Sequence, residues 1–466
     1  MNPRSDEPAL TAVNPADTSH RLLRLRRWLV SPDGLTIGVA GFLAGYWLMW
    51  NAELQFIWMV VTIFPGLWSH WRQALEDRMF QDPVLRIMTA LIALTLGVGL
   101  IQNFPRADWN YRWEYLIGAL AMPPVFAALW IVCRHGRAAT LMKTCAWSGA
   151  LAAAVSLVWW HEVQAVESPG ARLHNPLVYG GLHPVATGIF GGFALVALAL
   201  CYIRQRANRS GWKNAATLAA LAAATLAVCL TISRGAYIAV LAGLAVITIM
   251  ALLSLIWPSV AFTLRRTWPV LATITAVALV FFKDPSALLP IQVIPTVIDG
   301  KQAVQLETVS SDTLAELLAR GDTGRFTFYR SGIAMLDTWP KRLTGVGLWE
   351  PDEQLERQTS GAANHFHSLP VATLVHSGAA GCLLLLAAII PGLLRAWHLM
   401  QQGQGEWLVL LAFGFGGLIF DGQSACSLVT HPRFEALLLW VPLTAASAIA
   451  HRRRVPPGAE CRGNWR

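Results

Sequence analysis

Long apolar runs separated by short polar segments make up most of this chain of 466 residues. A helix that crosses a bilayer needs about 20 mostly apolar residues. About twelve runs approach that length, so the pattern predicts an all-α integral membrane protein with about twelve membrane helices. The predicted helices are 33–50, 54–69, 84–101, 115–133, 144–161, 183–203, 215–232, 236–256, 268–282, 368–394, 407–421 and 434–450.

The composition supports a membrane protein. Charged residues make up only 14% of the chain and hydrophobic residues 55%, whereas soluble domains carry roughly 25% charged residues. Many of the 21 tryptophans stand near the ends of the apolar runs. Tryptophans gather in this way at the two interfaces of a membrane.

The net charge of +9 is better explained by membrane topology than by nucleic-acid binding. If both termini lie inside, the inner segments hold nearly four times as many Arg and Lys residues as the short outer loops. Cytoplasmic loops of membrane proteins carry such an excess. The sequence therefore predicts cytoplasmic tails at 1–32 and 452–466, membrane helices at 33–282 and 368–451, and an outer loop or cap at 283–367.

The outer segment 283–367 is the one long polar stretch between apolar runs. Its Pro-rich part, 284–300, predicts an extended stretch at the membrane interface. Leucines at helical spacing predict a helix over 312–320, and a second helix is expected over 325–338, between Thr323 and Pro340. The segment is therefore expected to fold as a small cap.

Arg234 is the first residue with a chemical role to consider, and it stands in a tight connection between two predicted helices, T-I-S-R-G-A-Y. Ser233 is a predicted N-cap, which places Arg234 in the first turn of the next helix. Free N–H groups and the positive end of the helix dipole combine there with a planar guanidinium to form a site for phosphate. The alternative is an interfacial arginine that extends to the lipid headgroups.

Arg325 and His367 stand at two further predicted helix starts on the outer side. Arg325 follows a Gly–Asp–Thr–Gly turn, and Tyr329 lies one turn later on the same face; the alternative is a solvated loop arginine. His367 precedes Ser368, and a helix start disfavours the imidazolium. A neutral imidazole can act as a general base, although a capping or interfacial histidine remains the alternative.

Further residues are expected to line the same site: His183, His365, Tyr329 and Tyr237. A zinc site formed by His365, His367 and His376 is disfavoured, because His376 faces the opposite side of the helix and no Cys or acidic ligand has suitable spacing. The seven cysteines lie mostly in apolar runs or on the predicted inner side, so no disulfide framework is expected. Phosphate-loop, nucleophile-elbow and dinucleotide motifs are missing from the sequence.

These stretches resemble the O-antigen ligase/polymerase superfamily over roughly residues 180–400. The resemblance is carried by S-R-G-A-Y at 233–237, T-G-R-F at 323–326, L-T-G-V-G at 343–347 and H-S-L-P-V-A-T-L-V-H-S-G-A-A-G at 367–381. Ser368, Pro370 and His376 depart from the residues common in that superfamily.

The resemblance implies a membrane glycosyltransferase of the GT-C type that faces the periplasm of a bacterial inner membrane. It would transfer a glycan from undecaprenyl pyrophosphate to the lipid A–core of lipopolysaccharide, without a cofactor or metal. By resemblance, Arg234 and Arg325 bind the pyrophosphate and His367 activates the acceptor hydroxyl. The polymerase and protein-glycosylating branches remain alternatives, and the short C-terminal tail favours the ligase.

A flippase or other transporter, and a scaffold protein, are the alternatives from other classes. Transporters place ionisable residues within the membrane. In this sequence such residues are nearly absent from the middles of the predicted helices and stand at their ends. This placement favours the enzyme.

Overall fold

The computed structural model describes residues 28–29, 31–45, 52–76, 79–103, 109–165, 172–177, 184–204, 211–260, 262–283, 325–347, 350–359, 366–421 and 434–454. These residues are almost entirely helical. The first group of helices is α2 Pro32–Gly45, α3 Ala52–Thr62, α4 Phe64–Glu76, η1 Met79–Gln81, α5 Pro83–Asn103, α6 Trp109–Arg134, α7 Ala138–Trp159 and η3 Trp160–Gln164. The second is α9 Pro184–Ile203, α10 Gly211–Leu230, α11 Arg234–Leu253 and α12 Leu264–Lys283. The third is α14 Arg325–Ala334, α15 Trp339–Thr344, α16 Glu350–Gln358, α17 Leu369–Gln401, α18 Glu406–Asp421 and α20 Phe434–Arg454.

Within the described residues, seven helical segments are long and apolar enough to cross a membrane: α5, α7 with η3, α9, α10, α11, α12 and α17. The all-helical membrane character predicted from the sequence is therefore confirmed. Every predicted membrane stretch falls on one or more helices. The total of twelve membrane helices stays a prediction.

The predicted single helix 54–69 is wrong in one respect, because two helices, α3 and α4, meet at Ile63. Pro65 has no N–H to continue the helical hydrogen bonds across this point. Past it, α4 carries the exposed side chains of Trp68 and Trp71. Exposed tryptophans on a short helix are typical of the membrane interface.

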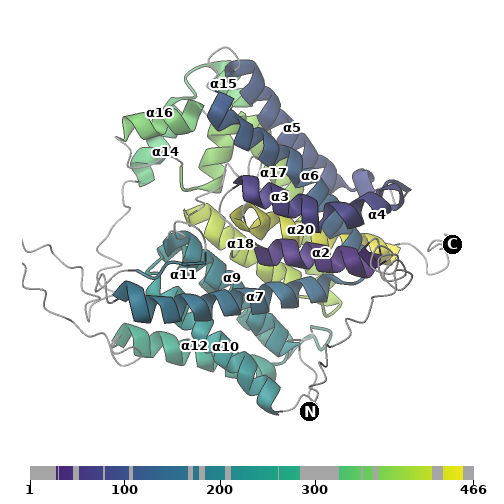
Figure 1. The fold of residues 1–466 in the computed structure, drawn as a ribbon, viewed down its shortest axis with the longest axis vertical. Coiled ribbons are helices and arrows are strands. Elements are labelled where there is room, and N and C mark those ends of the chain that lie inside the picture. The colour runs from purple at the N-terminus through teal and green to yellow at the C-terminus, as the bar shows by residue number, and fades with distance from the viewer. Residues whose placement is uncertain are drawn as a thin grey trace, which may run out of the picture.

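Helix α18 lies near the centre of the bundle and joins its two halves (Figure 1). It packs against α9 and α11 on one side and against α17 and α20 on the other. Nearly all of α9 is buried, and α9 contacts α7, α10 and α11. The core therefore lies between the two halves, around α9 and α18.

The short helices α14, α15 and α16 form a cap at one end of α17 (Figure 1). The helix predicted over 325–338 ends earlier, at Ala334, where the N–H groups of Met335 and Leu336 turn back to the carbonyls of Gly332 and Ile333. A separate helix, α15, then begins with Thr338 as its N-cap and Pro340 in its first turn. The sequence reading missed α16. The predicted stretch 284–300 and helix 312–320 lie outside the described residues.

Helix α17 is kinked at Gly378, which has φ 63° and ψ −164°. The loop after α15 fills the kink: the Val346 N–H donates to the carbonyl of Val375 at 2.8 Å, and the Gly347 N–H donates to that of His376 at 3.1 Å. A Cβ at Gly378 would lie 2.4 Å from the backbone of Leu343. The cap is therefore fixed to α17 by direct contact between two backbones.

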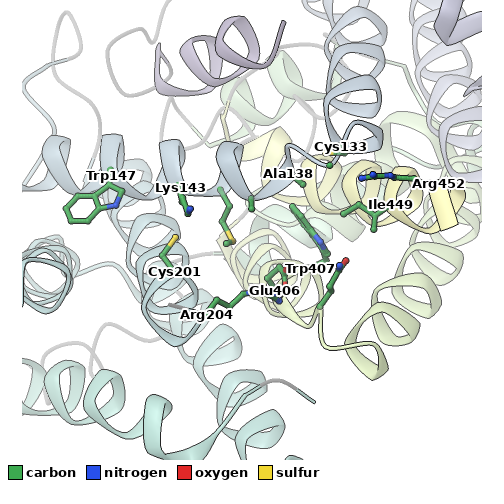
Figure 2. A pocket seen from close by; sticks show the side chains of 14 residues that line it. Cys133, Ala138, Lys143, Trp147, Cys201, Arg204, Glu406, Trp407, Ile449 and Arg452 are labelled. Carbon is green, nitrogen blue, oxygen red and sulfur yellow. Dashed lines mark hydrogen bonds and ion pairs between the residues drawn. The ribbon is translucent and has the colours of Figure 1, made fainter. Parts of the chain in front are cut away.

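Ion pairs connect the helices at the opposite end of the bundle. Arg204, after α9, pairs with Glu406 at the start of α18 (Figure 2). Arg137, before α7, pairs with Asp33 of α2 at 2.7 Å, but both side chains are at least half exposed. The exposed pair contributes little to stability.

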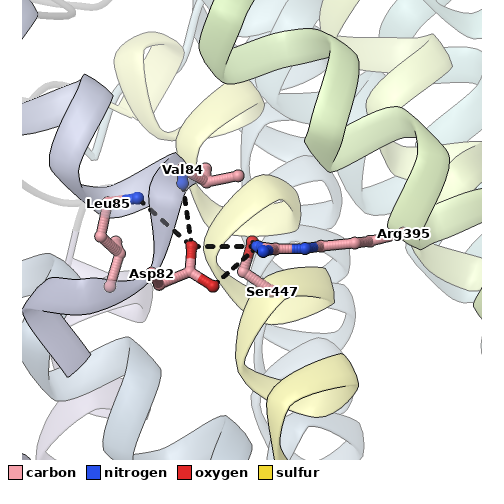
Figure 3. A network of polar contacts seen from close by, with 5 residues as sticks. All are labelled: Asp82, Val84, Leu85, Arg395 and Ser447. Atoms are coloured by element: carbon pink, nitrogen blue, oxygen red, sulfur yellow. Dashed lines mark hydrogen bonds and ion pairs between the residues drawn. The ribbon is translucent and has the colours of Figure 1, made fainter. Parts of the chain in front are cut away.

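A buried ion pair ties α5, α17 and α20 together (Figure 3). Asp82 accepts hydrogen bonds from the N–H groups of Val84 and Leu85 at the start of α5. Its carboxylate also contacts Arg395 of α17 at 2.8 and 2.9 Å, and Arg395 donates to the Ser447 hydroxyl of α20 at 2.5 Å. This network satisfies a charged carboxylate that is 3% exposed.

Candidate active site

Arg234 is the first residue of α11 and follows the turn 231–233. Ser233 is extended, with φ −105° and ψ 110°, and its hydroxyl accepts a hydrogen bond from the Ala236 N–H at 3.4 Å. The predicted N-cap and the predicted helix start are confirmed. The half-buried Arg234 therefore stands at the positive end of the helix dipole, where an anion is stabilised.

The turn before Arg234 is strained. Ile232 has φ 46°, a left-handed conformation that is rare for a β-branched residue. Arg172 holds this turn by donating from Nε to the carbonyl of Thr231 at 2.7 Å and from Nη2 to that of Ile232 at 3.2 Å. The Leu173 N–H donates to the carbonyl of Leu230 at 3.0 Å. The carbonyls of Leu230, at the end of α10, and of the turn residues Thr231 and Ile232 are thus satisfied by a distant segment, which brings a second guanidinium beside the turn.

Tyr237 also fixes the turn. Its hydroxyl donates to the carbonyl of Cys229 at 2.7 Å, and its ring meets the Phe282 ring edge-on at 6.0 Å. These contacts connect α11 with the end of α10 and with α12. They give Tyr237 a structural role, and its place in the site lining stays a prediction.

The segment 172–177 and the start of α9 complete this half of the site. The Asn175 N–H donates to the Thr187 hydroxyl at 2.9 Å. Gly188, one turn into α9, lies so close to the turn that a Cβ there would be 2.6 Å from the Thr231 hydroxyl. Burial lowers the pKa of His174 below its usual 6.5. His183 lies outside the described residues, directly before α9.

His367 has the same local geometry as the turn before Arg234. Its φ is 51°, and the next residue, Ser368, is the extended N-cap of α17 with φ −157° and ψ 121°. The helix start predicted after His367 is confirmed, with Pro370 in the first turn. In both places a non-glycine residue in a left-handed conformation precedes a serine cap, and such outliers cluster at functional sites.

The cap positions the ring of His367. Phe328 of α14 stacks on the imidazole, with 6.0 Å between the ring centroids and 29° between the planes. Helix α14 approaches closely at Gly332, where a Cβ would lie 2.6 Å from the ring of Phe366 and 2.9 Å from Val375. The fully buried Phe366 in turn meets the His376 ring edge-on at 5.8 Å.

Arg325 begins α14, one turn before Phe328, so the cap brings the segment of Arg325 to His367. Tyr329 lies on the same helix, and its ring meets that of Phe326 edge-on at 6.0 Å. His365 lies outside the described residues. Sequence reasoning missed Phe328 and Arg172, since no local motif marks either of them.

The site has two halves, which different helices position. The turn around Arg234 is held by contacts with α9, α10 and the segment 172–177, whereas His367 is held by α14 and α17. Helix α18 packs against both α11 and α17 and so links the two halves. Among the described residues, no group of three or more His, Cys, Asp or Glu side chains is placed to hold a metal ion.

A comparison with known families finds one match in the region of these residues. The family model described as O-antigen ligase matches residues 218–386. This part of the chain is similar to the O-antigen ligase family. The O-antigen ligase region contains Arg234, Arg325 and His367 together with the kink at Gly378, so the resemblance found in the sequence is confirmed. A comparison with curated proteins finds no match.

Proposed function

We propose that the protein transfers a glycan from undecaprenyl pyrophosphate to the lipid A–core of lipopolysaccharide, on the periplasmic side of the inner membrane. The observation that carries this proposal is the single family match over Arg234, Arg325 and His367. Each of these residues stands at or just before a helix start. Helix starts favour anions, and a pyrophosphate is the anionic group of the substrate.

Arg234 and Arg325 bind the pyrophosphate in this proposal. As the bond between the sugar C1 and the phosphate oxygen breaks, negative charge grows on the leaving pyrophosphate. Donors fixed in advance stabilise that charge without a reorganisation cost. Arg172 donates hydrogen bonds to the carbonyls of Thr231 and Ile232, and this fixes the direction of the first turn of α11.

His367 acts as the general base. The acceptor hydroxyl attacks C1 from the side opposite the pyrophosphate, its oxygen forms the new bond, and its proton passes to the imidazole. The configuration at C1 is therefore inverted. The negative charge of the pyrophosphate stabilises the imidazolium that this proton transfer forms. The stacked ring of Phe328 limits how far the imidazole can turn.

A polymerase of the same superfamily is the second candidate, with another lipid-linked glycan as acceptor. A flippase would move the lipid-linked glycan without breaking its C1–O bond.

The test is reconstitution in liposomes with undecaprenyl-pyrophosphate glycan and lipid A–core, without added nucleotide or metal. The ligase predicts glycosylated lipid A–core and released undecaprenyl pyrophosphate. Chains that grow on the lipid carrier in the absence of lipid A–core would instead establish the polymerase. Translocation without any new glycosidic bond would refute both enzymes.

Substitutions with matched controls test the residues. His367→Ala is expected to lower the rate by about 10²–10⁴, the usual contribution of a general base. His398→Ala is its control, because His398 is an exposed histidine near the other end of the same helix. Arg234→Lys should lower the rate on the order of tenfold or more, since the planar fork is lost while the charge remains. Arg265→Lys at the start of α12 is the control, and equal rates in the two lysine variants would exclude the pyrophosphate role of Arg234.

A further inference from the structure

A cavity of about 750 Å³ lies among the ends of α6, α7, α9, α18 and α20 (Figure 2). Its polar lining includes Lys143, Arg204, Gln404, Glu406 and Arg452. None of these residues belongs to the candidate active site. The catalytic proposal therefore gives this cavity no role.

The cavity is at the end of the bundle opposite Arg234. Helix α9 ends at Ile203 beside the cavity, and α10 then runs back from Gly211 to Leu230, just before the turn of Arg234. Helix α7 begins near the cavity, at Ala138, and α18 begins at Glu406. The cavity thus lies where membrane helices end, which is the depth of lipid headgroups.

The polar side of the cavity is positively charged. Arg204 is neutralised by Glu406 and also donates to the carbonyl of Gly403 at 2.9 Å. Lys143 and Arg452 are exposed, and neither forms an ion pair with a residue that the structure describes. Within the part of the chain that the structure describes, two cationic side chains of this cavity therefore have no counter-charge.

The neighbouring His135 shows the same positive environment. Its pKa is lowered first by burial and then by the positive charges of His70, Arg134, Arg452 and Arg137. An anion bound at this end would relieve that repulsion.

The rest of the lining is apolar. Met142, Ile449 and Trp147 contribute to it, and Trp147 is 44% exposed. A soluble phosphate would gain nothing from these walls, whereas an acyl chain beside a phosphate would bury them. The combination fits an amphipathic anion.

We propose that this cavity binds an anionic phospholipid, with the headgroup attracted by the positive charges of Lys143 and Arg452 and an acyl chain against Met142, Trp147 and Ile449. Basic pockets between membrane helices bind lipid headgroups in this way. The inference rests on the membrane location of the chain and does not depend on the proposed glycosyl transfer.

The test measures binding to the purified full-length protein in a neutral detergent by titration calorimetry. The probes are dioctanoyl phosphatidylglycerol, dioctanoyl phosphatidylcholine and glycerol phosphate. We expect phosphatidylglycerol to bind most tightly, with an affinity that falls as salt is raised. Lys143→Ala and Arg452→Ala should each weaken that binding about fivefold.

Lys213→Ala and Arg265→Ala are the controls, because both are exposed cations at helix starts on the same end of the bundle but outside the cavity. They should bind phosphatidylglycerol as tightly as the wild type. The proposal is overturned if phosphatidylcholine binds as well as phosphatidylglycerol, or if the Lys143 and Arg452 variants match the controls. Equal affinity for glycerol phosphate would show that the site takes a soluble phosphate and not a lipid. The salt dependence of wild-type binding tests the electrostatic basis even if a variant does not fold.

Discussion

Replacing Gly378 by alanine tests how the cap is held on α17. A Cβ at this position would lie 2.4 Å from the carbonyl carbon and oxygen of Leu343 and 2.5 Å from the Gly345 nitrogen. Ordinary contact begins at 3.4 Å, so the two backbones must separate by about 1 Å. The φ of 63° and ψ of −164° also belong to a region that only glycine occupies readily.

The expected cost follows from these two effects. A side chain in that backbone region costs about 1–3 kcal/mol. Separation also breaks the hydrogen bonds from Val346 to Val375 and from Gly347 to His376, each worth about 0.5–1.5 kcal/mol. Gly378→Ala should therefore lower the free energy of unfolding by about 2–6 kcal/mol. Under the proposed mechanism glycosyl transfer should fall as well, because His367 stands directly before the half of α17 that the loop supports.

The assay is unfolding in mixed micelles of a mild detergent and SDS, followed by circular dichroism. Gly97→Ala in α5 is the matched control, since a Cβ there meets nothing within 4 Å and alanine favours a helix by about 0.5–1 kcal/mol. Gly345→Ala alters the other side of the same contact. The loss of unfolding free energy in the double variant should therefore be smaller than the sum of the losses in the two single variants. A Gly378→Ala protein as stable as the Gly97→Ala protein would refute the backbone contact.

Three further predictions concern stability. Asp82→Asn leaves the guanidinium of Arg395 without its carboxylate and should lower the free energy of unfolding by about 3–5 kcal/mol. Asp33→Asn breaks the exposed pair with Arg137 and should lower it by less than about 1 kcal/mol. Equal unfolding midpoints for the two variants would contradict this difference. Arg172→Ala leaves the carbonyls of Thr231 and Ile232 without their donor and should lower the free energy of unfolding by about 1–3 kcal/mol. Arg86→Ala, at an exposed arginine, is the control. Full stability with unchanged activity would show that the turn does not need Arg172. The lowered pKa of His135 means that the unfolded chain takes up its proton first, so stability is complete above the usual pKa of 6.5 and is lost as the pH falls below it. The melting temperature of His135→Gln should therefore fall less than that of the wild type between pH 8 and pH 5.5, roughly the range over which a histidine titrates; His398→Gln should follow the wild type, and the prediction fails if His135→Gln does so too.

The helix starts could be predicted from the sequence because their signals are local. Ser233 and Ser368 stand directly before the helices that they cap. Hydrophobic runs located the membrane helices, although α6 and α7 begin six residues before the predicted starts and α17 ends seven residues after the predicted end. The end of the helix predicted over 325–338 was misplaced because the N–H groups of Met335 and Leu336 form tighter turns than the pattern indicates.

The supports of the site could not be predicted because they join residues far apart in the chain. Arg172 reaches the carbonyls of residues 231 and 232, about 60 positions later, and nothing around it marks that contact. Phe328 reads as one more aromatic residue in T-G-R-F-T-F-Y-R until the fold places it on His367. The motif L-T-G-V-G was noticed through resemblance, and only the structure shows that its second half fills the kink of α17.

The left-handed backbone at His367 lowers the stability of the fold at the position of the proposed general base. A non-glycine residue there costs on the order of 1–3 kcal/mol, which glycine would largely recover. A library selected only for heat resistance should therefore enrich glycine at 367. Under the proposed mechanism, glycine at 367 would yield a more stable but inactive protein. Stabilisation campaigns on this chain should leave residue 367 fixed.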